Sequence, residues 1–370
     1  MLRHIKNQSP MSRSLYKSTL DFLNSQSSIK AQGNHLRRLQ TLCSMVCSCI
    51  GSKKSTLEGI SSGAEQTNSE STLKQSKRWL DSKWSDWESF YAPYIVGVLN
   101  KAMSQGEIIL LIDGSETAGN CVTLMISFIW GDYAIPLAWI TREGKKGHFP
   151  EQIHLDLVQQ IQGLFAPNQR VILLGDGEFD GSKLRAWCNK HHWEFVLRTS
   201  KDHQVDCGGE IAPLARLYPH KGHQIVFLED ASQGDHAIIW RGKGHADPIP
   251  LLTNMELGAM ACRYYRKRFK IENLFKSLKS AGFNLHKSKV EGAKRVENLI
   301  IVVALAFVLT ICVGMILKKQ PKNLLKTFVR VDRVPKMSPI LLAQKCLDKA
   351  LELALTFFSN LSKNWTLFFT

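Results

Sequence analysis

Two aspartates follow strongly apolar stretches of the chain and could do chemistry together. Asp113 ends the run IILLID, and Asp176 ends the run VILLGD. Such runs are typical of buried strands, so both carboxylates should emerge at strand ends into glycine-containing turns. Carboxylates that share one edge of a sheet can bind Mg²⁺ or Mn²⁺, because hard divalent cations prefer oxygen ligands. Either aspartate alone could instead be a turn residue, since Asp-Gly is common in turns.

A third acidic residue lies in the basic segment RYYRKRFKIENLFKSLKS. Five of its side chains are spaced by three, four, four and three positions, namely Tyr265, Arg268, Glu272, Lys276 and Lys279. On one continuous helix, which we expect from Leu257 to Ala281, they form a single stripe. The alternative is a surface helix in which Glu272 pairs with its basic neighbours, which contributes only ~0.3–0.5 kcal/mol per pair.

The spacing Tyr-x2-Arg-x3-Glu-x6-Lys, together with two strand-end aspartates upstream, resembles a specific family signature. It matches the DDE transposases of the bacterial insertion sequence four family at Tyr265, Arg268, Glu272 and Lys279, and the resemblance covers residues 30–318. The resemblance implies a ribonuclease H-like catalytic core. It also implies that Glu272 and the two aspartates are the catalytic and metal-binding residues.

The family resemblance further implies a reaction. Asp113, Asp176 and Glu272 would hold two Mg²⁺ or Mn²⁺ ions per active site, and such ions lie about 3.5–4 Å apart in enzymes that cut phosphodiesters. The reaction would be strand cleavage at terminal inverted repeats and 3′-hydroxyl attack on target DNA, a cut-and-paste route through a DNA hairpin. Coordinated cutting at two ends implies a dimer in the DNA complex.

DNA contacts are also implied by the resemblance. Tyr265, Arg268 and Lys279 would bind near the terminal phosphate, and Lys276 lies on the same stripe. Trp240 could stack on a flipped base, as an aromatic residue of the insertion does in some relatives, or it could be a core residue.

One departure from the family pattern follows the second aspartate. Many relatives carry Arg-Gly there, whereas this chain continues from Asp176 as GEFDG. Glu178 and Asp180 could therefore compete as metal ligands, although a side chain at the strand end is better placed. Two other activities stay open: a ribonuclease H-like nuclease that cuts without strand transfer, and a catalytically silent DNA-binding descendant.

The elements that must position these residues follow the order βββαβαβ. We expect strands at residues 108–112, 122–130, 133–140, 171–174 and 193–197. One helix should begin near residue 150, before the fourth strand, and another should lie around 184–187, before the fifth. This order predicts an α/β fold of the ribonuclease H-like kind, with a mixed central sheet covered by helices on both faces. Short β-like runs at 225–228 and 237–240 predict a β-rich insertion before the Glu272 helix.

We divide the chain into six segments. They are a basic flexible arm with at most a short helix (1–30), a helical DNA-binding region (31–103), the first part of the core (104–202), the β-rich insertion (203–252), the second part of the core with the catalytic helix (253–318), and a basic helical tail (319–370). In the helical region, Lys74, Lys77 and Arg78 either contact DNA or form a solvated face.

Composition indicates the partner and the compartment. Forty-eight Lys and Arg against 32 Asp and Glu give a net charge of +16, which favours a polyanion, with double-stranded DNA ahead of an anionic membrane. Nine cysteines without a paired framework are typical of reduced core residues, and we expect no secretory signal in MLRHIKNQSP. We therefore expect a DNA-associated protein of the bacterial cytoplasm.

One uncharged run could be mistaken for a membrane span. Leu299 to Leu317 contains 19 residues without a charge and is followed by two lysines. A carbonate-resistant membrane protein anchored by this run is one possibility. We expect a helix buried in the core and no membrane, because the run is single and directly follows the charged Glu272 segment.

Overall fold

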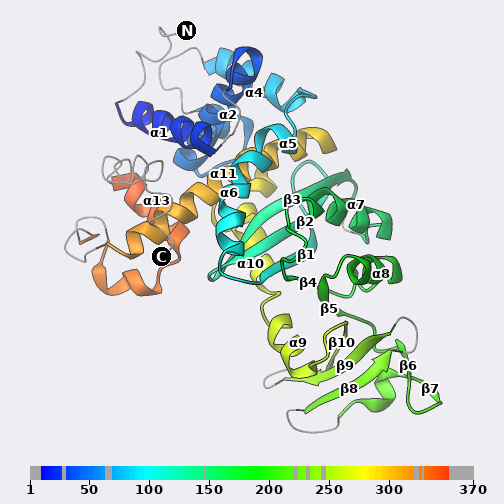
Figure 1. Ribbon diagram of the computed structural model, residues 1–370. Coiled ribbons are helices and arrows are strands. Elements are labelled where there is room, and N and C mark those ends of the chain that lie inside the picture. The colour runs from blue at the N-terminus through cyan, green and yellow to red at the C-terminus, as the bar shows by residue number, and fades with distance from the viewer. Residues whose placement is uncertain are drawn as a thin grey trace.

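The computed structural model describes residues 10–26, 31–62, 69–145, 147–219, 224–230, 234–242, 247–320, 325–326 and 329–349. Its centre is a mixed eight-stranded sheet with the order β3-β2-β1-β4-β5-β10-β9-β8, and helices flank it (Figure 1). The predicted fold class is confirmed, because the first five strands have the order and directions of the ribonuclease H-like arrangement.

The first five strands form the half of the sheet that was predicted from the apolar runs. They are β1 (Ile108–Glu116), β2 (Cys121–Trp130), β3 (Tyr133–Glu143), β4 (Val171–Gly175) and β5 (Glu194–Arg198). β1, β2 and β3 make an antiparallel meander, whereas β4 pairs in parallel with β1 and β5 in parallel with β4. The parallel pairs require crossovers, which contain α7 (Glu151–Gln162) and α8 (Ser182–Lys190).

The β-rich segment after β5 continues the same sheet. β8 (Gln224–Asp230), β9 (Asp235–Arg241) and β10 (Ile249–Thr253) join through antiparallel pairing of β10 with β5. β6 (Gln204–Asp206) and β7 (Ile211–Pro213) form a separate two-stranded sheet. β10 was missed from the sequence because Pro250, which cannot donate a ladder hydrogen bond, lies within it.

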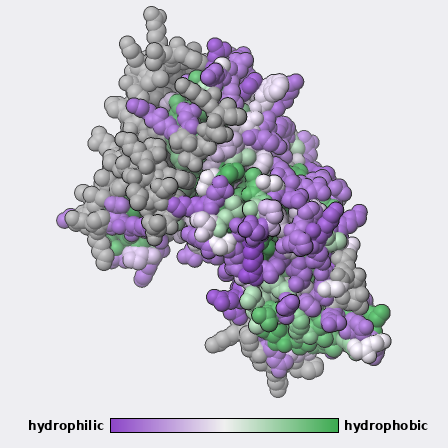
Figure 2. Space-filling model, in the orientation of Figure 1, coloured by the Kyte–Doolittle hydropathy of each residue, from purple (hydrophilic) through white to green (hydrophobic). Residues whose placement is uncertain are grey.

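Apolar side chains gather on the surface of this end of the molecule (Figure 2). Ile211, Phe227, Leu257 and Met260 are exposed there. Elsewhere the coloured part of the face shown in Figure 2 is mainly hydrophilic.

Six helices precede the sheet among the residues that the structure describes. They are α1 (Pro10–Gln26), α2 (Gly33–Ser52), α3 (Leu57–Ser61), α4 (Ser69–Asp81), α5 (Trp87–Phe90) and α6 (Ala92–Met103). The prediction of at most a short helix in a flexible arm was wrong for residues 10–26, because Leu15, Thr19, Phe22 and Leu23 recur at helical spacing, are buried, and belong to a helix that packs on α2. Residues 1–9 and 27–30 of that segment lie outside the described residues.

The helix predicted from Leu257 to Ala281 is broken. The structure has α9 (Gly258–Tyr265), a turn at 266–269, α10 (Lys270–Lys276) and a π-helical turn, Ser277–Ala281. Within the turn the amides of residues 267, 268, 270 and 271 bond to carbonyls three residues earlier, which tightens the backbone and changes the helical phase. The predicted continuous helix was therefore wrong. Four members of the predicted stripe, Arg268, Glu272, Lys276 and Lys279, still line one pocket, whereas Tyr265 is buried outside it.

The apolar run belongs to α11 (Ala293–Lys318), which lies between the N-terminal helices and α13 (Pro339–Lys349) (Figure 1). α11 contacts α2, α4, β3 and α13. Among the described residues it is the helix whose length and composition would also allow it to cross a membrane, and 94% of its most apolar window is buried inside the protein. Packing on all sides explains a helix without a polar face. Short 3₁₀ turns occur at Leu214–Leu217, Leu285–Lys287 and Val331–Lys336.

The contact between α11 and α13 depends on Gly314. A Cβ added there would clash with the main-chain carbonyl of Pro339. We expect Gly314→Ala to lower the free energy of unfolding by about 1–3 kcal/mol, the usual effect of overpacking. The matched control is Gly51→Ala in α2, where an added Cβ meets nothing within 4 Å and helix propensity should raise stability by up to about 1 kcal/mol. Urea unfolding measures both, and equal effects of the two changes would contradict the prediction.

Candidate active site

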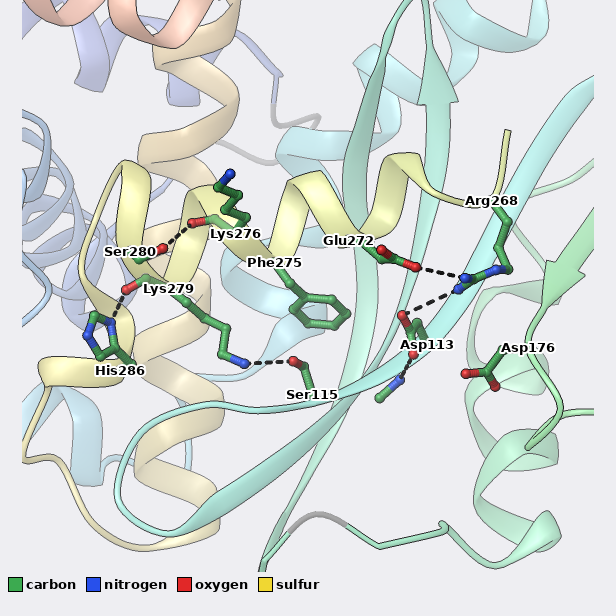
Figure 3. Close-up of a pocket in the computed structure, with 11 residues that line it drawn as sticks. Asp113, Ser115, Asp176, Arg268, Glu272, Phe275, Lys276, Lys279, Ser280 and His286 are labelled. Atoms are coloured by element: carbon green, nitrogen blue, oxygen red, sulfur yellow. Dashed lines mark hydrogen bonds and ion pairs between the residues drawn. The ribbon is translucent and has the colours of Figure 1, made fainter. Parts of the chain in front are cut away.

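The register of two strands brings the aspartates together. Leu111 of β1 lies opposite Leu174 of β4, and the two strands are parallel. Asp113 and Asp176 each stand two residues further along, so both carboxylates leave the sheet at the same edge and on the same face. Figure 3 shows their side chains side by side at one end of a pocket.

Glu272 reaches this pocket from α10, across from the strand ends (Figure 3). The pocket has a volume of about 600 Å³. Its acids lie at one end together with Arg268, and Lys276, Lys279 and His286 lie at the other, with the Phe275 ring between the two ends. The lining residues are Asp113, Gly114, Ser115, Asp176, Arg268, Glu272, Phe275, Lys276, Lys279, Ser280 and His286. The structure thus brings the three predicted acids together at one site.

Arg268 lies between two of the acids. Its Nη2 donates a 2.7 Å hydrogen bond to Glu272 Oε1, and its Nη1 is 3.8 Å from Asp113 Oδ2. The Arg268 side chain is only 9% exposed. Its guanidinium therefore acts as an internal counterion for the acidic end of the pocket.

The acidic end carries more negative charge than Arg268 offsets. Burial, and then the charge of Asp176, raise the pKa of Asp113 from 3.8 to about 6. Arg268 and the 2.8 Å hydrogen bond from the Gly114 amide oppose this shift, and Glu272 adds to it. Asp113 is therefore hard to ionise beside two other carboxylates. A cation bound at this end of the pocket would favour its ionised form.

The loop after β4 shows which of its acids faces the pocket. Asp176 lines the pocket, and its Oδ1 accepts a 3.1 Å hydrogen bond from the Glu178 amide. The Glu178 carboxylate instead accepts a 2.6 Å bond from the Phe149 amide and lies 3.7 Å from His154 Nε2. Burial raises the pKa of Glu178, but the neighbouring His154 and the Phe149 amide outweigh it and lower the pKa overall.

Asp180, the other possible competitor, is also engaged elsewhere. Its Oδ2 accepts a 2.6 Å hydrogen bond from Thr199 Oγ1. Neither it nor Glu178 lines the pocket, whereas Asp176 does. The geometry therefore favours Asp176 as the second member of the acidic set.

The basic end of the pocket includes residues that the sequence did not indicate. Lys279 Nζ donates a 2.8 Å hydrogen bond to Ser115 Oγ, and the His286 ring bonds to the Lys279 carbonyl. Lys276 is exposed at the same end. Ser115 could have been found from its position two residues after Asp113, which places it on the same strand face. His286 lies in the 3₁₀ turn Leu285–Lys287, which no local sequence pattern predicted.

Other residues predicted to bind DNA lie outside the pocket. Tyr265 is buried, 2% exposed, with the Arg268 guanidinium 5.9 Å from its ring centroid. Trp240 is also 2% exposed and lies in β9, so in this conformation it is a core residue and has no exposed ring with which to stack on a base. The remaining three, Lys74, Lys77 and Arg78, are exposed on α4, where Lys74 pairs with Glu70 at 2.7 Å.

The donors of the acidic end fit a divalent cation in type. Three carboxylates offer the oxygen ligands that Mg²⁺ and Mn²⁺ prefer, and burial, followed by the charge of Asp176, raises the pKa of Asp113. Glu272 is engaged by Arg268 in this conformation. In the part of the chain that the structure describes, no three His, Cys, Asp or Glu side chains are already close enough together to hold an ion.

The raised pKa of Asp113 predicts a pH-dependent effect of Asp113→Asn on stability without metal. Folded Asp113 binds its proton more tightly than unfolded Asp113, so its stabilising contribution is present below pH 3.8 and is lost as pH rises through about 6. Asparagine does not ionise, so the variant should gain stability over wild type as pH rises from 4 to 7.5, by at most about 3 kcal/mol.

Chemical unfolding in EDTA at several pH values measures this difference. The control is Asp132→Asn on the exposed β2–β3 turn, where the side chain is 93% exposed and a pH-dependent gain of this kind is not expected. A stability difference for Asp113→Asn that stays constant across the pH range would contradict the prediction.

Comparisons with known proteins agree with the geometry. Residues 150–309 match the family model described as "Transposase DDE domain". The matched segment is less than half of the chain, and it contains Asp176 and Glu272 but not Asp113. None of the curated proteins matches the chain.

Two solved structures resemble this chain weakly, with low TM-scores and low sequence identity. A cryo-EM structure of the piggyBac transposase synaptic complex with hairpin DNA has a TM-score of 0.43 and 9% identity, covering 97% of this chain and 84% of that one. The catalytic domain of human Endonuclease V has a TM-score of 0.26 and 15% identity, covering 56% of this chain and 98% of that one. Neither similarity is high enough to carry functional information. The family match covers Asp176 and Glu272, and the pocket places Asp113 beside them. Together these findings support an enzyme of the DDE transposase class.

Proposed function

We propose that this chain is a DNA transposase of the insertion sequence four family, which cuts the ends of a mobile element and joins them to target DNA by a cut-and-paste route. One observation carries the proposal. Two strand ends and a separate helix bring Asp113, Asp176 and Glu272 to one pocket whose other end is basic. The match of residues 150–309 to a transposase DDE domain supports the same class of enzyme.

The acidic end of the pocket would hold two Mg²⁺ or Mn²⁺ ions. Asp113, Asp176 and Glu272 would be the ligands, and the Asp113 side chain lies between the other two (Figure 3). When bound, such ions activate a water or a 3′-hydroxyl and stabilise the leaving oxygen of the phosphodiester. Arg268 has to release Glu272 for this, and a nearby DNA phosphate offers its guanidinium another partner.

The basic end would bind the DNA strand beside the cut. Lys276, Lys279 and His286 lie together there, and Ser115 fixes the Lys279 ammonium by a 2.8 Å hydrogen bond. Contacts of this kind position a DNA backbone without selecting a sequence. The phosphates next to the scissile bond would therefore be held at one end of the pocket while the scissile phosphate lies at the acids.

The rest of the chain would supply DNA affinity. A net charge of +16 favours binding through counterion release, and Lys74, Lys77 and Arg78 present cations on the exposed side of α4. Double-stranded DNA, both the terminal inverted repeats and the target, is the partner of this proposal. Two protomers would act on the two ends, in the cytoplasm of a bacterium.

The proposal is tested by cleavage of a labelled duplex that carries the DNA flanking this gene. With Mg²⁺ we expect nicking by wild type, and a loss of at least about 100-fold in Asp113→Asn, Asp176→Asn and Glu272→Gln, because each removes one carboxylate from the acidic end. DNA binding in Ca²⁺ should be retained by all three. The matched control, Asp132→Asn, removes an exposed carboxylate outside the pocket and should cut normally.

Three other outcomes contradict the proposal in different ways. Nicking without strand transfer would indicate a nuclease of the same fold. DNA binding without any Mg²⁺-dependent nick would indicate a catalytically silent descendant. Cleavage that persists in all three variants would show that the pocket is not the active site.

A further inference from the structure

A turn between α4 and α5 leaves one tryptophan in solvent. Trp84 is 58% exposed, whereas Trp79, one turn earlier on the same segment, is 3% exposed. The Trp84 indole is therefore accessible to a partner.

The turn is held rigidly, so its exposure is not a consequence of loose packing. The fully buried Asn298 of α11 donates through Nδ2 to the Ser82 carbonyl at 3.4 Å. On the same helix, Arg295 pairs with Asp81 at 2.8 Å. Within the turn, the Trp84 amide donates to Ser82 Oγ at 3.2 Å. These contacts fix the backbone around Trp84 and direct its side chain away from the core.

Two cations lie over the exposed indole. The Arg38 guanidinium is 5.9 Å from the ring centroid, and Lys83 Nζ is 5.2 Å from it. Arg38 comes from α2, and its carbonyl accepts a 3.1 Å hydrogen bond from Trp79 Nε1, which ties it to the same segment. We call Arg38, Lys83 and Trp84 the Trp84 patch. None of the three lines the active-site pocket.

The chemistry of the Trp84 patch points to a partner that is both anionic and flat. An apolar protein surface would use the indole but leave two cations without partners, and an acidic peptide would use the cations alone. A nucleic acid chain satisfies all three side chains at once, because it alternates phosphates with sugars and bases that pack on aromatic rings. The net charge of +16 favours the same partner.

We propose that the Trp84 patch is a DNA-contact point, separate from the active site, in which the indole packs against a sugar or base while Arg38 and Lys83 bind the flanking phosphates. The inference rests on the proposed function, since it places DNA on the N-terminal helices. It adds a site that the carboxylate pocket does not require.

The test is fluorescence anisotropy with a labelled duplex in EDTA, over a series of salt concentrations. Trp84→Ala should weaken binding about 5- to 100-fold, the range for loss of one aromatic contact, and leave the slope of log affinity against log salt unchanged. Lys83→Ala should weaken binding and reduce that slope by about 1, because one phosphate contact is lost. Trp84→Phe should retain most of the affinity.

The matched control is Leu257→Ala, which removes an exposed apolar side chain, 61% exposed, at the other end of the molecule. It should bind DNA as wild type does. If Trp84→Ala behaves like this control while wild type binds DNA, the inference fails and the proposed function stands. A reduced salt slope for Trp84→Ala would overturn packing against a sugar or base. Absence of wild-type binding to any duplex would overturn both.

Discussion

The parallel pairing of β1 with β4 determines where Asp113 and Asp176 lie. Because Leu111 faces Leu174 across the pair, the carboxylates two residues later share one edge of the sheet. Burial of this edge, and then the proximity of the two carboxylates, raise the pKa of Asp113. The helix with Glu272, the buried Arg268 and the basic end of the pocket are arranged around that concentration of charge.

Arg268 shows how the fold manages this charge. Three acids near one another would repel, and a partly buried site screens the repulsion poorly. A guanidinium 2.7 Å from Glu272 and 3.8 Å from Asp113 offsets part of it within the chain. The tightened turn at 266–269 brings Arg268 inward, so an irregularity of the backbone contributes directly to the balance of charge in the site.

Much of the half of the sheet that holds Asp113 and Asp176 could be predicted, because its sequence signals are local. The runs before Asp113 and Asp176 are nearly all apolar, and such runs indicate buried strands whatever surrounds them. The break before α10 could not be predicted in this way, because a turn with bonds three residues apart has the same composition as a helix. Only packing on the sheet selects it. β10 was missed for a different reason. Pro250 is a local signal against a strand, but pairing with β5 forms the strand nevertheless.

The burial of α11 has a consequence for how the chain reaches this structure. Its partners include α2, which precedes it by more than half of the chain, and α13, which follows it. The contacts with α2, which is so distant in sequence, form late, and an apolar helix that waits for them is prone to aggregation in the meantime. Folding is therefore completed only when nearly the whole chain is present, and loss of either α2 or α13 leaves this helix open to self-association.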